Sequence, residues 1–188
     1  MGRIVVSEFL TLDGVMEDPG GSEGLERGGW AFRFERGPEG DKFKLDETLD
    51  AEALLLGRRT YDGFAAAWPS RTDEAGFADK MNSMPKFVVS STLRDPEWAN
   101  TTVVTADDLE RLRQDTDGTL LVAGSAQLVN ALTERGLVGE LRLMVFPVVL
   151  GTGKRLFRDG LPQRGFDVVE TRKTGEVVIV VLRPKPDG

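Results

Sequence analysis

The chain has 188 residues, 40% of them hydrophobic and 29% charged, which is the composition of an ordinary globular protein and the size of one domain. Its formal net charge of −7 argues against nucleic acid as a partner, because duplex binding needs many Lys and Arg side chains facing the phosphates. It has no cysteine and no histidine, which excludes disulfides, thiolate chemistry and the commonest metal ligand.

No run of about 18 apolar residues occurs, and Arg3 already begins a strand-like segment, without the charged and apolar regions of a secretion signal. We therefore expect a cytoplasmic protein without a membrane segment and without a bound metal. Size and composition also lead us to expect a single domain over residues 1–188.

Short apolar segments rich in Val, Ile and Leu alternate with segments of helical periodicity, which is the pattern of strands joined by crossover helices. Strands are expected at residues 3–10, 53–57, 86–90, 102–105, 119–123, 138–147, 165–173 and 176–183. The first five are expected to be buried and mostly parallel. Glycine-containing turns separate the last ones, so we expect an α/β fold whose parallel sheet is closed by an antiparallel edge.

Helices are expected between these strands, at residues 41–49, 58–68 and 74–83, from 105 past 112, and at 125–135. By contrast, residues 14–40 are expected to form a long loop, because five glycines fall between Gly20 and Gly29. Loops of this length inside compact domains are usually lids or binding loops. Trp30 in this loop is expected either to belong to the core or to cap a planar substrate.

The end of the strand at 53–57 carries groups that suit phosphate binding. Gly57 is followed directly by Arg58, Arg59 and Thr60 at the start of a helix. Unpaired backbone N–H groups and the helix dipole favour an anion there, and guanidinium groups add charge-assisted hydrogen bonds. The alternative is that the two arginines are solvated surface residues.

Two further strand ends have related chemistry. Ser90 and Ser91 follow a buried strand, where hydroxyl groups line the nucleotide crevice of many open α/β sheets or else form a simple turn. Gly124, Ser125 and Ala126 lead from another strand into a helix, where glycine allows either close approach to a pyrophosphate or tight packing. If the three strands are neighbours, their turns together form a cradle for a phosphorylated dinucleotide.

Five segments spread over nearly the whole chain carry a resemblance to a known family. They are Ser7-Glu-Phe-Leu-Thr-Leu-Asp13-Gly14, Leu56-Gly-Arg-Arg-Thr-Tyr61, Val88-Val-Ser-Ser91, Val122-Ala-Gly-Ser-Ala126 and Val145-Phe-Pro-Val-Val-Leu-Gly-Thr-Gly153. In this order they resemble the dihydrofolate reductase family proteins of bacteria, which are similar to the reductase domain of the bifunctional riboflavin-biosynthesis deaminase-reductase.

The resemblance implies a three-layer dihydrofolate reductase-like fold, NADPH lying across the strand ends, and a homodimer. By motif, the adenosine 2′-phosphate would be held by Arg58, Arg59 and Thr60, the adenosine ribose and phosphates would lie near Ser90 and Ser91, and the pyrophosphate would contact Gly124, Ser125 and Ala126. Asp13 and Gly14 would lie beside the nicotinamide and the substrate. The arginine pair favours NADPH over NADH, since only NADPH carries the extra phosphate.

A reduction also needs a proton, and without histidine the candidate donors are Asp13 and Asp41, either protonated or orienting a water. The alternatives are a turn-forming role for Asp13 and a helix N-cap role for Asp41. Leu128 stands where true dihydrofolate reductases carry an aromatic residue, which argues against folate reduction.

The leading hypothesis is an NADPH-dependent reductase of a small pteridine- or pyrimidine-like ring, resembling 5-amino-6-(5-phosphoribosylamino)uracil reductase or dihydrofolate reductase. One alternative is a homodimer of the same fold that binds NADPH without turnover, and another is a purely structural dimerisation module. The apolar segment Leu141–Leu150 could supply the surface for a symmetric partner. Lys154 and Arg155 could hold a substrate phosphate or be exposed cations on a turn.

Overall fold

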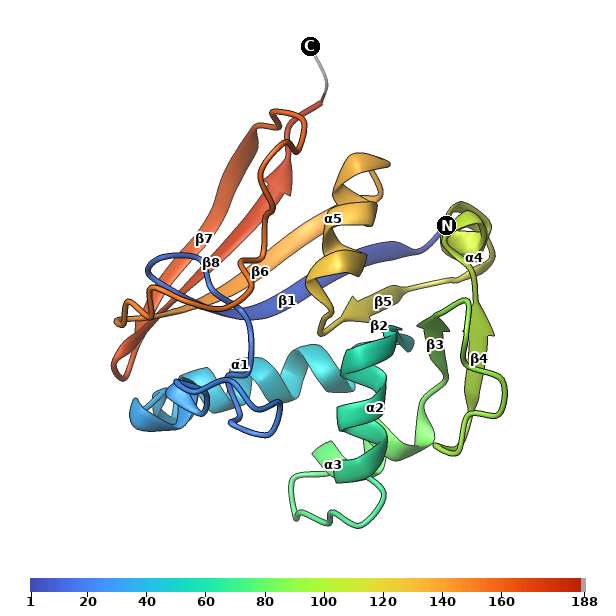
Figure 1. Cartoon of the computed structure of the whole chain (residues 1–188), viewed down its shortest axis with the longest axis horizontal. Helices are drawn as coiled ribbons and strands as arrows, with labels where there is room; N and C mark the ends of the chain where they lie inside the picture. The colour runs from blue at the N-terminus through green and yellow to red at the C-terminus, as the bar shows by residue number, and fades with distance from the viewer. Residues whose placement is uncertain (187–188) are drawn as a thin grey trace.

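Eight strands form one sheet in the order β4-β3-β2-β5-β1-β6-β8-β7 in the computed structural model, which describes residues 1–186 (Figure 1). The strands are β1 (Arg3–Thr11), β2 (Ala53–Gly57), β3 (Lys86–Val89), β4 (Thr101–Val104), β5 (Thr119–Val122), β6 (Val138–Phe146), β7 (Phe166–Thr174) and β8 (Val177–Pro184). Strands from β4 across to β6 pair in parallel, whereas β8 pairs antiparallel with both β6 and β7. The expected mainly parallel sheet with an antiparallel C-terminal edge is therefore confirmed.

Five α-helices connect the strands of the described chain: α1 (Gly37–Leu49), α2 (Arg58–Ala67), α3 (Phe77–Ser83), α4 (Leu109–Asp115) and α5 (Ala126–Glu134). The expected start of the first helix at residue 41 is wrong, because α1 begins at Gly37. Pro38 lies in its first turn, where a missing backbone N–H leaves no bond unmade and the fixed φ of proline suits the helix.

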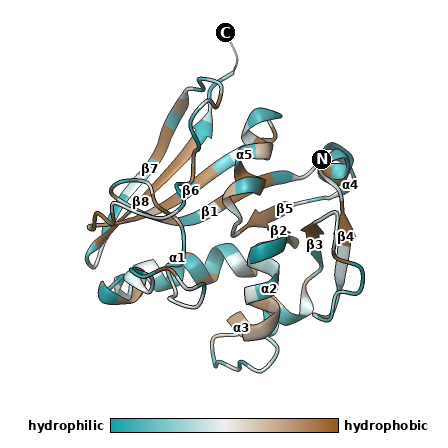
Figure 2. Cartoon of the chain, in the orientation of Figure 1, coloured by the Kyte–Doolittle hydropathy of each residue, from teal (hydrophilic) through white to brown (hydrophobic). Residues whose placement is uncertain are grey.

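Helices cover both faces of the sheet, which gives the molecule three layers (Figure 1). On one face, Leu109 of α4 and Leu132 of α5 pack in a buried cluster with Ile4, Val6 and Leu10 of β1. Side chains alternate along a strand, so these even-numbered residues of β1 share one face. Complete burial of a leucine contributes about 1.5–3 kcal/mol to folding, and Figure 2 shows the apolar colour concentrated along the central strands.

On the other face, Tyr61 of α2 and Met81 of α3 pack against Val5 of β1 and Leu56 of β2. Figure 1 shows α1 on this side of the sheet as well, running beneath β1 and β6. The two faces of β1 therefore contribute to two different cores. Its even-numbered residues Ile4, Val6 and Leu10 pack with α4 and α5, and its odd-numbered Val5 packs with α2 and α3.

The antiparallel part of the sheet has its own core, and Trp30 is at its centre. Trp30 is fully buried and its indole Nε1 donates a hydrogen bond to the backbone oxygen of Glu17 at 2.9 Å. Its ring meets Phe146 edge to face, with ring centroids 5.3 Å apart. Of the two alternatives for Trp30, the structure selects the core residue and not the substrate cap.

A buried carboxylate on β6 is surrounded by arginines. Glu140 is only 2% exposed, and its carboxylate oxygens lie 3.2 Å from Nη1 of Arg3, 2.8 Å from Nε of Arg142 and 3.0 Å from Nε of Arg183. We call these four residues the Glu140 cluster. Within residues 1–186, no helix is both long and apolar enough to cross a membrane.

Candidate functional site

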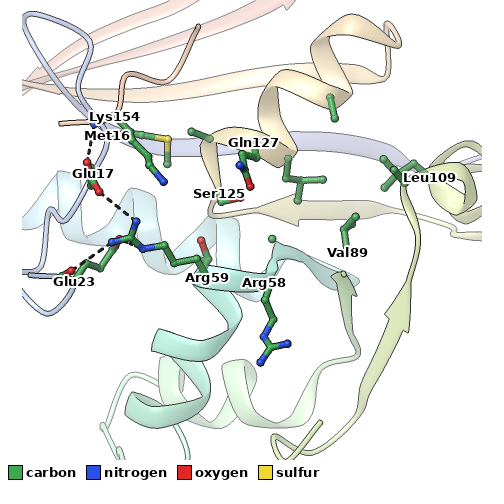
Figure 3. A pocket seen from close by; sticks show the side chains of 16 residues that line it. Met16, Glu17, Glu23, Arg58, Arg59, Val89, Leu109, Ser125, Gln127 and Lys154 are labelled. Carbon is green, nitrogen blue, oxygen red and sulfur yellow. Dashed lines mark hydrogen bonds and ion pairs between the residues drawn. The ribbon is translucent and has the colours of Figure 1, made fainter. Parts of the chain in front are cut away.

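A cavity of about 240 Å³ opens where β2 and β5 end (Figure 3). Its wall contains six of the residues that the sequence predicts for cofactor binding, namely Gly57, Arg58, Arg59, Thr60, Ser125 and Ala126. Apolar side chains complete it, among them Met16, Val89, Leu109 and Leu128. The cavity therefore combines polar strand ends with an apolar wall that excludes water, as ligand sites usually do.

The predicted neighbourhood of the three strand ends is confirmed, because β3, β2 and β5 are adjacent in the sheet. The N–H of Gly57 donates a hydrogen bond to the oxygen of Gly124 at 3.1 Å. A Cβ atom on Gly57 would lie 2.2 Å from Oγ of Ser125, and one on Gly124 would lie 2.4 Å from Oγ1 of Thr60. Both glycines are thus required by tight packing between the two strand ends, and for Gly124 this is one of the alternatives that the sequence left open.

Two helices begin at this cavity without a side-chain cap. α2 starts after Gly57 and α5 starts after Ser125, and in neither case does the residue before the helix bond to the first turn through its side chain. The first-turn N–H groups of a helix have no intrahelical partner, and the helix dipole gives them positive character. Since first-turn residues of both helices line the cavity, the site is suited to an anion such as a phosphate.

The two arginines of the predicted phosphate site have different partners. Arg58 pairs with Asp62 one helical turn later, with Nε 2.8 Å from Oδ1, and its Nη1 lies 3.5 Å from Oγ1 of Thr92. Figure 3 shows its guanidinium directed away from the long N-terminal loop. Arg58 therefore lies on the side of the cavity where the Ser90 turn is found.

Arg59 points the opposite way and is held by two carboxylates of the loop after β1 (Figure 3). Its Nη1 lies 3.3 Å from Oε1 of Glu17, and its Nε lies 3.3 Å from Oε2 of Glu23. The backbone N–H of Lys154 donates to the other oxygen of Glu17 at 2.7 Å. Burial raises the pKa of Glu23, while the charge of Arg59 acts in the opposite direction.

Glu17 and Glu23 were not predicted as site residues, although their loop was expected to be a lid or binding loop. The loop is fixed by a buried carboxylate, because Asp18 accepts hydrogen bonds from the N–H groups of Glu23 at 2.9 Å and Leu25 at 3.0 Å. The acidic residues of a glycine-rich loop were the available signal, but their partner Arg59 lies far along the chain. The pairing therefore depends on tertiary structure.

Asp13, one of the two predicted proton donors, has both carboxylate oxygens engaged. Oδ1 accepts from Oγ1 of Thr11 at 2.6 Å and from the N–H of Leu150 at 3.2 Å, and Oδ2 accepts from the N–H of Gly151 at 2.8 Å. The hydrogen bond from Thr11, followed by those from the backbone, lowers the pKa of Asp13 to about 2. This ionised carboxylate ties the end of β1 to the loop after β6, so the geometry supports an anchoring role.

Asp41, the second predicted donor, lies on the exposed side of α1. Its carboxylate pairs with Arg36 at 2.7 Å, and it is not among the residues that line the cavity. The alternative role of helix N-cap is wrong, because Arg36 occupies that position. Asp13 therefore has no free oxygen to offer a ligand, whereas the catalytic role of Asp41 stays a prediction.

Ser90 forms a turn, as one of its two interpretations required. Its Oγ accepts hydrogen bonds from the N–H groups of Thr92 at 3.2 Å and Leu93 at 3.0 Å. Neither Ser90 nor Ser91 lines the cavity, although the turn follows β3, the direct neighbour of β2. Their contact with an adenosine stays a prediction.

Comparisons with known proteins agree with this fold. The family model described as RibD C-terminal domain matches residues 3–180. Two proteins of Bacillus subtilis (strain 168) named as uncharacterized, YyaP and YwjB, are each 26% identical to this chain, over 187 and 179 residues. The alignment with YyaP covers 96% of this chain and 93% of the relative, and that with YwjB covers 94% of both.

Solved structures show the same similarity. A putative riboflavin biosynthesis protein from Shewanella sp. PV-4 matches with a TM-score of 0.75 and 19% identity, over 98% of this chain and 99% of the other. One crystal form of Acinetobacter baumannii RibD matches with a TM-score of 0.68 and 14% identity, over 99% of this chain but 59% of the other. A second form gives the same TM-score at 16% identity.

Proposed function

This chain belongs to the RibD C-terminal domain family, and from that membership we propose that it is an NADPH-dependent reductase of a small pteridine- or pyrimidine-like ring. The observation that carries the proposal is the convergence of two uncapped helix N-termini on one cavity that also holds Arg58 and Arg59. A dinucleotide with several phosphates fits these groups chemically, because each phosphate oxygen needs a donor or a positive charge.

The two arginines are not equivalent in this proposal. Within residues 1–186, the carboxylate paired with Arg58 belongs to its own helix, and the side chain is half-exposed, so a phosphate can approach it without displacing a carboxylate of another element. Arg59 is already bound by Glu17 and Glu23, and a phosphate there must displace two carboxylates. We therefore assign the 2′-phosphate of NADPH to Arg58 and the neighbouring N–H groups of α2.

NADPH, when bound, supplies the hydride. The chain must align donor and acceptor, hold the phosphates and exclude water. The start of α5 at Ala126 is placed to receive a pyrophosphate, and Met16, Val89 and Leu128 provide a dry wall. A pyrimidine of riboflavin synthesis, 5-amino-6-(5-phosphoribosylamino)uracil, is the first substrate to test, since structural neighbours are described as riboflavin biosynthesis protein and RibD.

Thermal unfolding with NADPH, NADH and no ligand tests the cofactor assignment. NADPH at about 100 times its dissociation constant should add about 2.7 kcal/mol of stability, and NADH at the same concentration should add less. Arg58→Ala should remove this discrimination, while Arg59→Ala is the matched control that should retain most of it. Equal responses of the native protein to both cofactors would contradict the 2′-phosphate assignment, and no response to either would contradict the reductase.

Loss of NADPH absorbance with the pyrimidine or with a dihydropteridine then separates an enzyme from its alternative. A homodimer that binds NADPH without turnover would show the stability shift and no oxidation of the cofactor. Reduction of either ring supports the reductase.

A further inference from the structure

The loop after β6 brings a third cation to the candidate site. Lys154 belongs to this loop and lines the cavity, together with Met16 and Glu17 of the segment after β1. Figure 3 shows its side chain extending from the loop into the cavity, at the end that lies away from Val89 and Leu109. The sequence left open whether Lys154 holds a phosphate or is an exposed cation on a turn, and its place in the cavity wall brings it within reach of a ligand.

The backbone at Lys154 is held in place by the segment after β1. Its N–H donates a hydrogen bond to Oε2 of Glu17 at 2.7 Å, and its carbonyl oxygen accepts one from the N–H of Met16 at 2.9 Å. The next residue, Arg155, donates from Nε to the backbone oxygen of Asp13 at 3.0 Å. Because the first two contacts use the backbone of Lys154, a substitution at this position removes the cation and leaves the loop attached.

The ammonium group of Lys154 differs from the other charged groups of the cavity in having no partner. The two carboxylates of the wall are both bound by Arg59, and Arg58 is paired with Asp62 on its own helix. Among residues 1–186, Nζ of Lys154 makes neither a hydrogen bond nor an ion pair. Its charge lowers the pKa of Glu23 from a longer distance. Lys154 can therefore bind an anion without giving up a contact.

The charge of the cavity wall also favours an anion beside Lys154. The charged side chains that line the cavity are three cations and two carboxylates, so the wall has one positive charge in excess, whereas the whole chain has a net charge of −7. A positive wall in a concave site raises the local concentration of anions. An ammonium group binds phosphate as a point charge, without the fixed geometry of a guanidinium.

The phosphates of NADPH have other donors in the proposed binding mode. Arg58 and the start of α2 take the 2′-phosphate, and the start of α5 at Ala126 takes the pyrophosphate. Lys154 belongs to neither helix and comes from the loop after β6. It is therefore available to the second reactant of a reduction, which is the ring substrate.

We propose that Lys154 is a specificity-determining residue, whose ammonium group binds a phosphate group attached to the ring substrate. This inference rests on the proposed function and adds the residue that selects the substrate. Lys154 takes no part in the transfer of the hydride or of the proton. Its loss should therefore weaken the binding of a phosphorylated substrate and leave the chemical step unchanged.

Binding of ribose 5-phosphate tests the contact without turnover, because this sugar carries a phosphate and no ring to be reduced. Titration followed by nuclear magnetic resonance, on the free protein and on the protein saturated with NADPH, should shift backbone amide signals of the loop around Lys154 in both states. Ribose, the neutral control ligand, should leave these signals in place. Lys154→Met should weaken the binding of ribose 5-phosphate by about 10-fold or more, and Lys154→Arg should keep most of it.

Arg155→Met is the matched control variant, since it removes the same charge one residue away. Arg155 is not among the residues that line the cavity, and its Nε is engaged by the backbone oxygen of Asp13. This variant should bind ribose 5-phosphate within about twofold of the native affinity, because an exposed charge outside the site is screened by salt. An equal loss of affinity in both variants would show a general effect of charge and would overturn the inference.

Turnover separates substrate selection from a structural role of Lys154. With NADPH, Lys154→Met should raise KM for 5-amino-6-(5-phosphoribosylamino)uracil by about 10- to 100-fold and leave kcat within about threefold of the native value. KM for the same pyrimidine without its phosphate group should not change. A structural role would impair both substrates alike, and that result would contradict the proposed contact.

The remaining outcomes separate this inference from the proposed function. If the native protein binds no ribose 5-phosphate, or if Lys154→Met binds it as tightly as the native protein, the inference fails and the reductase is unaffected. If saturation with NADPH abolishes the binding, Lys154 serves a phosphate of the cofactor and the inference fails as well. If the native protein binds no NADPH, the reductase fails, while binding of ribose 5-phosphate that depends on Lys154 would still support the phosphate contact.

Discussion

Two buried glutamates of the same sheet have opposite surroundings. Glu140 of β6 is 2% exposed and is bonded or ion-paired to three arginines. Glu8 of the adjacent strand β1 is 7% exposed, and its buried Oε1 has no hydrogen-bond partner among residues 1–186. Burial alone raises the pKa of each. At Glu140 the hydrogen bonds and charges of Arg142, Arg183 and Arg3 outweigh burial and lower the pKa below its usual value.

The difference shows that depth in the sheet does not determine the charge of a carboxyl group. The hydrogen-bond and charge partners of a carboxyl group determine whether it is ionised. Glu140 is an ionised structural group that holds β6 and β8 together, since Arg142 belongs to β6 and Arg183 to β8. Glu8 lacks such arginine partners, and burial raises its pKa to about 8, so it is protonated at neutral pH.

The largest expected effect concerns the pH dependence of stability. Folded Glu8 keeps its proton up to about pH 8, whereas the unfolded chain loses it near 4.5, so the folded state binds more protons between these values. The free energy of unfolding therefore falls as pH rises, by at most about 1.4 kcal/mol per pH unit and on the order of 4 kcal/mol over the window. Glu8→Gln should remove this component.

Urea denaturation from about pH 5 to pH 9 measures this contribution of Glu8 to the free energy of unfolding. The stability of Glu8→Gln relative to the native protein should rise with pH and level off above about 8. Curves that stay parallel over the whole range would show that Glu8 is ionised in the folded protein, and the contrast with Glu140 would disappear.

The second effect comes from breaking the Glu140 cluster. Glu140→Ala leaves Arg142 largely buried, and removing one partner of a buried ion pair typically costs roughly 3 kcal/mol. For a chain of this size that corresponds to a loss of roughly 10 °C in Tm. Urea denaturation at neutral pH checks the loss in free energy of unfolding, and calorimetry checks the loss in Tm.

An exposed pair provides the control for that change. Glu170→Ala removes the partner of Arg172 on β7, where both side chains are partly exposed, and should cost less than about 1 kcal/mol. If both alanine variants lose the same stability, the Glu140 cluster has no special energetic role.

The smallest expected effect is the influence of Lys44 on the pKa of Glu8. Lys44 is a cation that lowers the pKa of Glu8, so Lys44→Met should raise that pKa. Infrared spectroscopy measures it as the midpoint pH at which the C=O stretch of the protonated carboxyl group is lost. Lys42→Met is the control on the same helix, because Lys42 is exposed and paired with Asp46, and it should leave the midpoint unchanged. A downward shift in Lys44→Met would mean that Lys44 does not stabilise the Glu8 carboxylate.

The strands and the polar or glycine residues at their ends could be predicted from the sequence, because apolar runs and glycines are local signals. Pro38 shows the limit of that approach: the first helix starts earlier than its apolar stripe suggested, since a proline suits a first turn. Glu8 carried a signal that was not used. Glu8 lies two residues from Val6 and two from Leu10, so it is on the same face of β1 as these core residues. A charged residue in that position indicates a buried carboxyl group.

The contact of Arg59 with Glu17 and Glu23 could not be predicted, because nothing local specifies which distant guanidinium a loop carboxylate meets. Likewise, the hydrogen bonds of Asp13 to Leu150 and Gly151 join segments at opposite ends of the chain. For both sites the sequence indicated the residue types and the fold determined the pairs.

Arg59 also keeps Glu23 acidic. Burial raises the pKa of Glu23, and the charges of Arg59 and Lys154 lower it. Replacing Arg59 by a neutral residue would therefore increase the affinity of this loop carboxylate for a proton. The ion pair thus holds the loop after β1 to the start of α2 and also helps to maintain the negative charge of that loop.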